Sequence, residues 1–444
     1  MLKVQGLVSK VLVIAPRRVC YSVWPVEAEL WTDFKDLRVE ILHGPHKDQA
    51  LQREADLYVI NPEGLDWLLG TTKTKGASGK TQVAVDKRRF KALGFDTLVI
   101  DELSKFKHPS TNRFKALKQV LGTFGRRWGL TGSPSPNGLL DLFGQCYVLD
   151  EGHALGRYIT HYRQAYFMTV DHAGYDWQLM PGAEERIYER LSPLVLRMAA
   201  EDYLELPELL HNIIRVDLPD AVRAVYDDLE EHLFAMIDKK SVTAANAAVA
   251  SGKCRQVAAG GLYLDPADEL NPVFKAKKDW ANLHTAKVDA LEDLVEELQG
   301  SPLLVAYDFK HDLDRLRARF GKDVPVIGGG TSDKRAAELE RLWNAGKLPL
   351  LLGHPQSIGH GLNLQQAGHH ICWHTLTWDY ELYDQFIRRV YRQGNKAHRV
   401  TVHHLLARDT IDEAVLGALR AKAKGQRALF DALKALQKGR KKVA

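Results

Sequence analysis

The sequence has few cysteines, no long apolar run and little net charge. No segment approaches the roughly 18 consecutive apolar residues of a membrane-spanning helix, and Met1–Lys10 lacks a signal-peptide pattern. The cysteines are too scattered for a disulfide framework or a CxxC metal site. These absences favour a cytoplasmic protein without a membrane segment. The four cysteines are Cys20, Cys146, Cys254 and Cys372.

The net charge of +5 is unevenly distributed along the chain. Residues 420–444 contain nine Lys or Arg and one Asp, whereas the first 419 residues contain 52 basic and 55 acidic side chains. The average charge is too small to predict nucleic-acid binding. The basic end could contact DNA phosphates or serve as a solvated tail, and both interpretations stay open.

The length of 444 residues, of which 45% are hydrophobic, suits about two to four packed domains. Residues 1–150 alternate short β-branched runs with helix-like segments, which indicates βα units. Residues 151–284 show a mostly helical pattern with few strand signals. The βα pattern returns in residues 285–412, and residues 413–444 are expected to form a basic helical tail.

Short runs that are apolar on both faces predict the buried strands of two parallel sheets. Helices are expected at Ser22–Trp31 and over residues 287–298, and a long surface loop at Leu69–Arg89. The predicted fold class is therefore α/β, with two parallel-sheet lobes and a helical middle region. The predicted strands are Val11–Ala15, Val39–Leu42, Leu57–Ile60, Thr97–Asp101, Arg127–Leu130, Leu303–Ala306, Val324–Ile327, Pro349–Leu352, His370–Trp373 and Val400–Leu406.

Two acidic residues lie at the end of the apolar strand Thr97–Asp101, where Asp101 is its last residue and Glu102 follows. The carboxyl edge of a parallel sheet is where nucleotide enzymes hold Mg²⁺. In that interpretation Asp101 binds the metal through water, and Glu102 orients or deprotonates an attacking water. A helix cap at Asp101 is the alternative. The next strand runs into a turn of small residues, Thr131-Gly132-Ser133, which could lie close to phosphate or to the acid pair.

The segment from Gln385 to Asn395 is the most informative part of the second half. On a helix, Gln385, Arg389 and Arg392 share one face. Arginines aimed at a phosphate stabilise the charge that develops during transfer, although a solvated basic face is the usual alternative. The loop just before this segment spaces glycines at Gly359 and Gly361, which let backbone amides approach phosphate.

Together these segments resemble the superfamily 2 helicase-related ATPases, and within them the Swi/Snf-like translocases of double-stranded DNA. The resemblance extends from Val11 to about Glu413. The matching segments, in the family's order, are Val11–Pro16 with Trp24, Leu57–Gly64, Asp101–Lys107, Leu130–Pro134, Leu194–Met198 with Leu206-Pro207, Lys253–Gln256, Lys287, Gly328–Thr331, Gly359–Leu364, Trp378, Gln385–Asn395 and Thr410–Glu413. Leu103-Ser104 and Ser133 depart from the commonest family residues.

The resemblance implies two RecA-like lobes with ATP between them and a DNA groove across both. Asp101 with Mg²⁺, Glu102, and the arginine fingers Arg389 and Arg392 would be catalytic. Residues that couple the nucleotide to DNA would be Gln385, Thr131, Gly132, Ser133, Gly359 and Gly361. DNA contacts would come from Pro16, Arg17, Asn61, Ser357, Asn363 and Trp378. A bacterial or bacteriophage protein acting in the cytoplasm, or in an infected cell, fits this compact form.

One element that the family needs is not found in the sequence. The phosphate-binding loop GxxxxGK[ST] should precede Val11 by roughly 30 residues, and Met1–Lys10 contains no such loop. The segment Gly76–Thr81 ends in Gly-Lys-Thr, but Thr74 stands where the first glycine belongs. Without this unit the first lobe would lack a central strand and a covering helix, so that apolar surface would be exposed.

Two explanations account for the missing loop. The chain could be an N-terminally shortened form of a working ATPase, through a late start, a split gene that encodes the preceding segment separately, or an incomplete sequence. Alternatively, it could be a non-hydrolysing module that binds DNA or a protein. We favour the first, because Asp101, Glu102, Arg389 and Arg392 are all present.

A zinc site is a further alternative on the strand that carries His370, Cys372 and His374, whose spacing places them on one face. We set it aside because a fourth ligand is not evident and the neighbouring residues fit a buried strand. His403 and His404 are expected to be structural.

Overall fold

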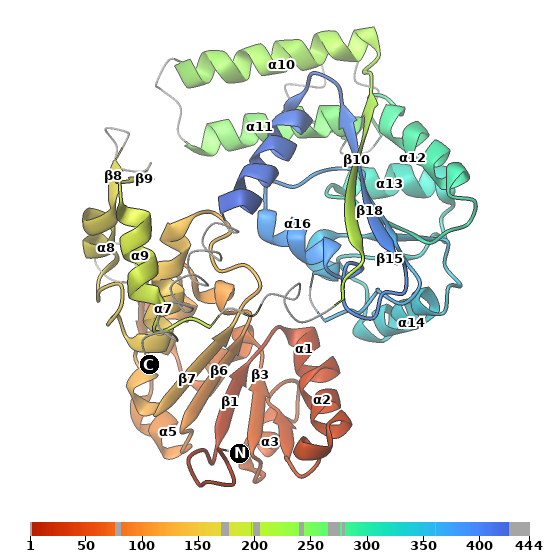
Figure 1. Ribbon diagram of the computed structural model, residues 1–444. Coiled ribbons are helices and arrows are strands. Elements are labelled where there is room, and N and C mark those ends of the chain that lie inside the picture. The colour runs from red at the N-terminus through yellow and green to blue at the C-terminus, as the bar shows by residue number, and fades with distance from the viewer. Residues whose placement is uncertain are drawn as a thin grey trace. The chain divides into compact units, whose positions relative to one another are not determined.

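The chain consists of two compact units in the computed structural model, Met1–Met198 with Lys422–Ala444, and Ala199–Ala421. Figure 1 shows their helices and strands. The structure describes residues 2–75, 81–169, 177–196, 198, 205–238, 244–264, 276–277, 280–359 and 361–425.

The first unit contains a five-stranded parallel sheet with the order β2-β3-β1-β6-β7. Each of the five strands was predicted from its apolar run, to within one residue at either end. The strands are β1 (Val11–Ile14), β2 (Val39–Ile41), β3 (Leu57–Ile60), β6 (Thr97–Asp101) and β7 (Arg126–Leu130).

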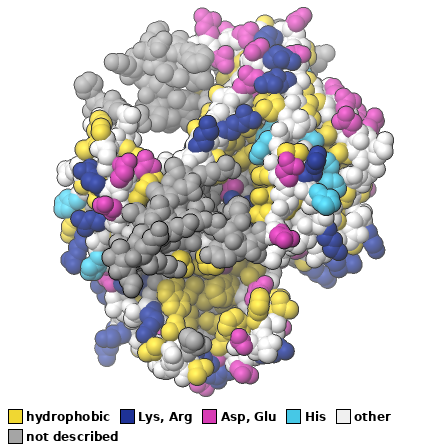
Figure 2. All heavy atoms as spheres, viewed as in Figure 1, with side chains coloured by type: hydrophobic (Ala, Val, Ile, Leu, Met, Phe, Trp, Pro, Cys, Tyr) yellow, Lys and Arg dark blue, Asp and Glu magenta, His cyan; other side chains and the backbone are white. Residues whose placement is uncertain are grey.

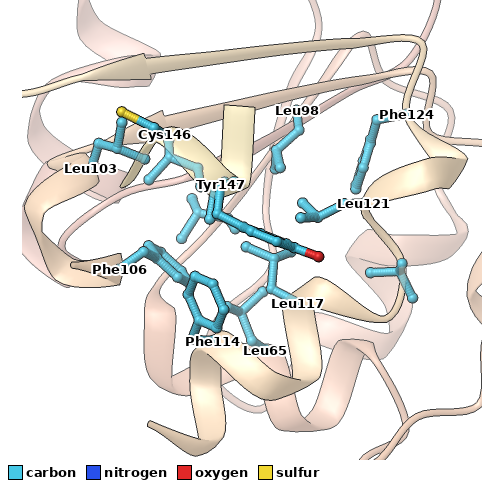
Figure 3. Packing of buried hydrophobic residues seen from close by; sticks show 14 of the residues in the cluster. Leu65, Leu98, Leu103, Phe106, Phe114, Leu117, Leu121, Phe124, Cys146 and Tyr147 are labelled. Atoms are coloured by element: carbon cyan, nitrogen blue, oxygen red, sulfur yellow. The ribbon is translucent and has the colours of Figure 1, made fainter. Parts of the chain in front are cut away.

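One face of this sheet carries the main hydrophobic core of the unit. Leu98 on β6 packs there with Phe106, Phe114, Leu117 and Tyr147, which come from the segments that follow the strand (Figure 3). The helices of the unit are α1 (Arg17–Ser22), α2 (Trp24–Leu30), α3 (Lys47–Gln52), α4 (Leu65–Leu68), α5 (Lys87–Ala92), α6 (Asn112–Lys118), α7 (Leu142–Asp150), α8 (Ile159–Tyr166) and α9 (Ala183–Leu191).

The opposite face of the sheet is less completely covered. Val13, Val59 and Val99 are buried there against α1. Trp128 of β7 pairs with Val99 in the strand register, so it lies on this face, yet Trp128 and Leu130 are 44% and 54% exposed. Figure 2 shows hydrophobic side chains gathered over β7, β6 and β1. The exposed apolar surface predicted for this lobe is therefore present at β7, the last strand in the sheet order.

The prediction of a long surface loop at Leu69–Arg89 is wrong in part. Its threonine-rich ends form an antiparallel pair, β4 (Thr72–Lys75) and β5 (Thr81–Ala84). Threonine favours a strand even when most side chains face solvent, and it alternates with lysine along β4. A phosphate loop joins a strand to a helix, whereas these two strands pair with each other. Most of the segment Gly76–Thr81 lies outside the described residues.

The second unit contains a six-stranded sheet with the order β10-β18-β17-β14-β16-β15, parallel throughout. Its strands are β10 (Glu208–Val216), β14 (Leu303–Ala306), β15 (Val326–Ile327), β16 (Leu350–Gly353), β17 (His370–Trp373) and β18 (Arg399–Ala407). The helices are α10 (Asp220–Asp238), α11 (Ala244–Ala259), α12 (Ala286–Glu297), α13 (Lys310–Phe320), α14 (Asp333–Asn344), α15 (Pro355–Ile358) and α16 (Tyr380–Ile387).

The middle region contains more strand than its sequence pattern indicates. Strand β10 pairs with β18 over nine residues, so it belongs to the sheet of the second unit. It lies at the sheet edge, where exposed polar residues interrupt the apolar ones, and it therefore lacks the continuous run of a central strand. Two small antiparallel sheets complete the region, β8 (Phe167–Thr169) with β9 (Trp177–Leu179), and β11 (Gly261–Tyr263), β12 (Ala276–Lys277) and β13 (Trp280–Asn282).

The predicted fold class, α/β with two parallel-sheet RecA-like lobes, is confirmed. Of the predicted tail, residues 413–425 continue a helix that begins at residue 411, and residues 426–444 lie outside the described residues. The helices within the described ranges include none that is long and apolar enough for a transmembrane span.

Candidate functional site

Asp101 and Glu102 lie where β6 ends. Asp101 is the last residue of the strand, and Glu102 has a left-handed backbone, with φ of +68°, before the short turn Leu103–Phe106. This backbone region is uncommon for residues other than glycine, and such residues cluster at functional sites. Both carboxylates are half-buried. The strand end therefore presents two fixed carboxylates at the edge of the sheet where α/β proteins bind ligands.

Glu102 is held by hydroxyl groups from two segments. The Ser104 hydroxyl donates to its Oε1 at 2.8 Å, and the Thr131 hydroxyl donates to the same oxygen at 3.3 Å. The backbone N–H of Ser133 donates in turn to the Thr131 hydroxyl at 3.3 Å. The pairing of Asp101 with Leu130 between β6 and β7 brings these segments together. The predicted proximity of the threonine turn to the acid pair is thus confirmed, whereas the contribution of Ser104 was not predicted.

The two carboxylates fit a magnesium ion better than an all-protein metal site. Mg²⁺ usually retains several waters and takes one or two carboxylates together with substrate phosphates. In the described part of the chain, no group of three or more His, Cys, Asp or Glu side chains could hold a metal. A magnesium ion at Asp101 would therefore take its other ligands from water and a nucleotide phosphate. The zinc alternative at His370, Cys372 and His374 is not supported.

The predicted arginine pair lies beyond the end of a helix. Helix α16 ends at Ile387, so Arg389 and Arg392 do not share a helix face with Gln385, and that prediction is wrong. Turns continue the chain there, with the N–H of Arg389 bonded to the carbonyl of Phe386. The two guanidinium groups nevertheless contact one loop, the glycine-spaced loop after α15.

Arg389 and Arg392 bind this loop differently. Arg389 donates to the carbonyl oxygens of Leu362 at 3.1 Å and Gly359 at 2.8 Å. Arg392 is exposed and donates to Oδ1 of Asn363 at 2.6 Å. Arg389 therefore stabilises the loop backbone, whereas Arg392 contacts a loop side chain at the protein surface.

The two loop glycines satisfy different steric needs. A β-carbon at Gly359 would lie 3.0 Å from Oε1 of the buried Gln385 and 2.9 Å from the carbonyl oxygen of Pro355. Gly361 has a φ of +70°, which side chains rarely tolerate. The structure thus brings Gln385, Arg389 and Arg392 to the loop that contains Gly359 and Gly361.

The six predicted DNA-contact residues differ in exposure. Arg17 and Asn363 are exposed, and Ser357 and Trp378 are half-buried. Asn61 is only 5% exposed and donates to Oε2 of Glu63 at 2.8 Å, and Pro16 is buried. Pro16 and Asn61 therefore face their own lobe more than solvent.

Arg255 was not predicted as a site residue. Its guanidinium contacts the carboxylate of Asp308 and the carbonyl oxygen of Leu376, and lies 5.1 Å from the ring centre of Phe309. One turn earlier on α11, the Ser251 hydroxyl accepts from the Trp378 indole at 3.2 Å. Helix α11 thus fixes the loop that carries Trp378. The family-like segment Lys253–Gln256 was the only signal in the sequence.

A cavity of about 600 Å³ lies in the second unit, where β15 meets α14. It is lined by the glycine turn Gly328–Thr331, three basic side chains and Asp323. The N–H of Gly328 donates to the Thr331 hydroxyl at 3.0 Å and closes the turn. The basic residues are Arg317, Lys322 and Arg335.

Three histidines of the second sheet contact other side chains of that unit, namely His370, His403 and His404. Nδ1 of His370 and Nε2 of His403 lie 3.1 Å apart. Burial lowers the pKa of each to about 4, so both rings are neutral at pH 7. Nε2 of His404 lies 2.9 Å from the Tyr383 hydroxyl. Burial lowers the pKa of His404 to about 3.

Comparison with known proteins shows the family. The family model of the SNF2-related domain matches residues 2–262, and that of the helicase conserved C-terminal domain matches residues 286–394. The chain therefore belongs to the SNF2-related family of helicase-like proteins.

Two curated relatives extend over most of the chain. Putative protein p41 of Acyrthosiphon pisum secondary endosymbiont phage 1 is 35% identical over 95% of this chain and 88% of its own length. The putative ATP-dependent helicase/translocase YwqA of Bacillus subtilis is 22% identical over 93% of this chain but only 42% of its own length. Among solved structures, the Sulfolobus solfataricus SWI2/SNF2 ATPase core in complex with dsDNA is 21% identical. That match covers 94% of this chain and 81% of the archaeal chain, with a TM-score of 0.38.

Proposed function

We propose that this protein is a DNA-dependent ATPase that translocates on double-stranded DNA, with Mg²⁺ and ATP as its cofactors. The observation that carries the proposal is the pair Asp101 and Glu102 at a strand end, with Glu102 hydrogen-bonded to Thr131, in a chain of the SNF2-related family. Asp101 would hold the metal through water. The metal, when bound, neutralises charge on the phosphates.

Glu102 orients the attacking water and accepts its proton. The left-handed backbone and the hydrogen bonds from Ser104 and Thr131 restrict the carboxylate to one position. Holding a catalytic group in place before the reaction removes the entropic cost of ordering it later. The Thr131 hydroxyl contacts Glu102 directly, and it accepts a hydrogen bond from the backbone N–H of Ser133. The turn Thr131-Gly132-Ser133 thus couples the carboxylate to the rest of its lobe.

The two arginines have different roles in this proposal. Arg392, which is exposed, supplies positive charge to the phosphoryl group in transfer. Arg389 holds the loop Gly359–Leu362 through two carbonyl oxygens, and Gln385 packs against Gly359. Replacing Arg389 therefore disturbs this loop as well as any nucleotide contact.

DNA is bound through its phosphates by both units. Arg17 in the first unit, and Asn363 and Trp378 in the second, are accessible enough to reach the backbone. The basic cavity at Gly328–Thr331 offers amides, hydroxyls and guanidinium groups of the kind that bind backbone phosphates. The name of the Bacillus subtilis relative, a putative ATP-dependent helicase/translocase, supports this assignment.

Binding to duplex DNA should therefore depend strongly on salt and only weakly on sequence. With 6–10 phosphate contacts, affinity is expected to fall roughly 10³–10⁵-fold between 50 and 200 mM salt. Fluorescence anisotropy with two duplexes of unrelated sequence measures this, and Arg17→Ala should weaken binding to both equally. An affinity that is insensitive to salt, or that differs greatly between the duplexes, would contradict the proposal.

A further inference from the structure

One contact of the catalytic carboxylates comes from a residue without an assigned role. The indole N–H of Trp24 donates to Oδ2 of Asp101 at 3.1 Å. Trp24 is the first residue of α2, and Asp101 ends β6, so the bond joins segments that are 77 residues apart in sequence.

The Trp24 ring also packs against residues of the sheet. It is half-buried and packs against the cluster that contains Val13, Val59 and Val99. An indole has a single N–H and cannot accept a hydrogen bond, whereas a carboxylate can accept several. The bond therefore restricts rotation of the Asp101 carboxylate and leaves acceptor capacity for metal-bound water.

We infer that Trp24 is a positioning residue, which orients Asp101 for Mg²⁺ and links that carboxylate to the helices α1 and α2. This inference rests on the proposed function, because it needs a metal at Asp101. Partners of this kind, which orient a metal-binding carboxylate, typically change metal affinity or activity by about 10–100-fold when they are removed.

The position of Trp24 suits such a link. It follows helix α1, which begins at Arg17, the exposed residue proposed to contact DNA. Helices α1 and α2 are adjacent in sequence and pack together. The hydrogen bond of Trp24 therefore connects the helix pair α1 and α2 to the carboxylate at the end of β6.

The first experiment uses Mn²⁺ as a paramagnetic probe on the full chain labelled with ¹⁵N-tryptophan. The nine tryptophans give nine indole signals, and Trp24→Phe identifies one of them. Substoichiometric Mn²⁺ with a non-hydrolysable ATP analogue should broaden the Trp24 signal first. The Trp67 indole, which donates to Oδ1 of Asp48 at the same 3.1 Å, is the matched reference and should stay sharp.

The second experiment measures how hydrolysis depends on Mg²⁺ concentration. Trp24→Phe retains most of the ring but loses the donor, so the half-saturating Mg²⁺ concentration should rise roughly 10–100-fold, with a smaller effect on kcat. Trp67→Phe should match the wild type. If Trp24→Phe leaves the metal dependence unchanged, or if Mn²⁺ fails to broaden Trp24 in a protein that hydrolyses ATP, the inference is wrong. Absence of both hydrolysis and broadening would instead refute the proposed function.

Discussion

Replacing Glu102 by glutamine should slow ATP hydrolysis by roughly 10²–10⁴-fold, the usual contribution of a general acid or base. Glutamine preserves the size of the side chain and can still accept from the Ser104 and Thr131 hydroxyls. It cannot take a proton from water. The loss should therefore fall on kcat, whereas the affinity for duplex DNA should remain that of the wild type.

The matched control is Glu54→Gln. Glu54 is an exposed glutamate of the same unit, paired with Arg38 at 3.2 Å, and its replacement should leave hydrolysis unchanged. Phosphate release and DNA affinity are measured on the same preparations. A Glu102→Gln variant that turns over at the normal rate would remove Glu102 from the mechanism. A variant that no longer binds DNA would point to a structural role.

Replacing Lys287 by methionine should lower the free energy of unfolding of the second unit by about 3–5 kcal/mol, as is typical for breaking a buried ion pair. Nζ of Lys287 lies 2.6 Å from Oδ2 of Asp412, and the side chains are 0% and 2% exposed. Methionine fills a similar volume but leaves the Asp412 carboxylate buried without its cation. The same carboxylate accepts from the N–H of Ala407 at 2.9 Å, so the end of β18 should loosen as well.

Denaturant unfolding, followed for each unit by its own probe, measures this loss. Adding Asp412→Leu to Lys287→Met should recover part of it, since replacing both partners by apolar residues removes the unpaired charge. The control is Arg388→Ala, which breaks the more exposed pair of Arg388 with Asp384, 2.7 Å apart, and should cost at most about 1 kcal/mol. A loss at Lys287 no larger than at Arg388 would show that the buried pair contributes little.

The elements that the sequence predicts well are those whose signal is local. Strands such as Leu57–Ile60 and Leu303–Ala306 are buried on both faces, so continuous apolar runs mark them. Strand β10 was not predicted, because its stability depends on β18, which lies nearly 200 residues further along the chain. The paired strands β4 and β5 were not predicted either, because strands that are exposed to solvent carry no apolar pattern.

The functional site likewise contains features that local sequence signals predict and features that depend on distant contacts. The order of the motifs is sufficient to predict that Thr131 approaches Glu102, because both follow neighbouring parallel strands. The helical face proposed for Gln385, Arg389 and Arg392 is wrong since α16 ends at Ile387, yet the loop contacts of both arginines still bring them together. The bond from Trp24 to Asp101 and the contacts of Arg255 depend on tertiary geometry that no local pattern encodes.

DNA-stimulated ATP hydrolysis is the most direct test of the central claim, that Asp101 and Glu102 form the carboxylate pair of an ATPase. The 444 residues contain no GxxxxGK[ST] sequence. Phosphate release is therefore measured on this chain and on the chain expressed with the coding sequence upstream of Met1 retained. The expected result is Mg²⁺-dependent hydrolysis that rises with duplex DNA and is lost in Glu102→Gln. Tight DNA binding without hydrolysis in either form would contradict the claim and identify a non-hydrolysing binding module.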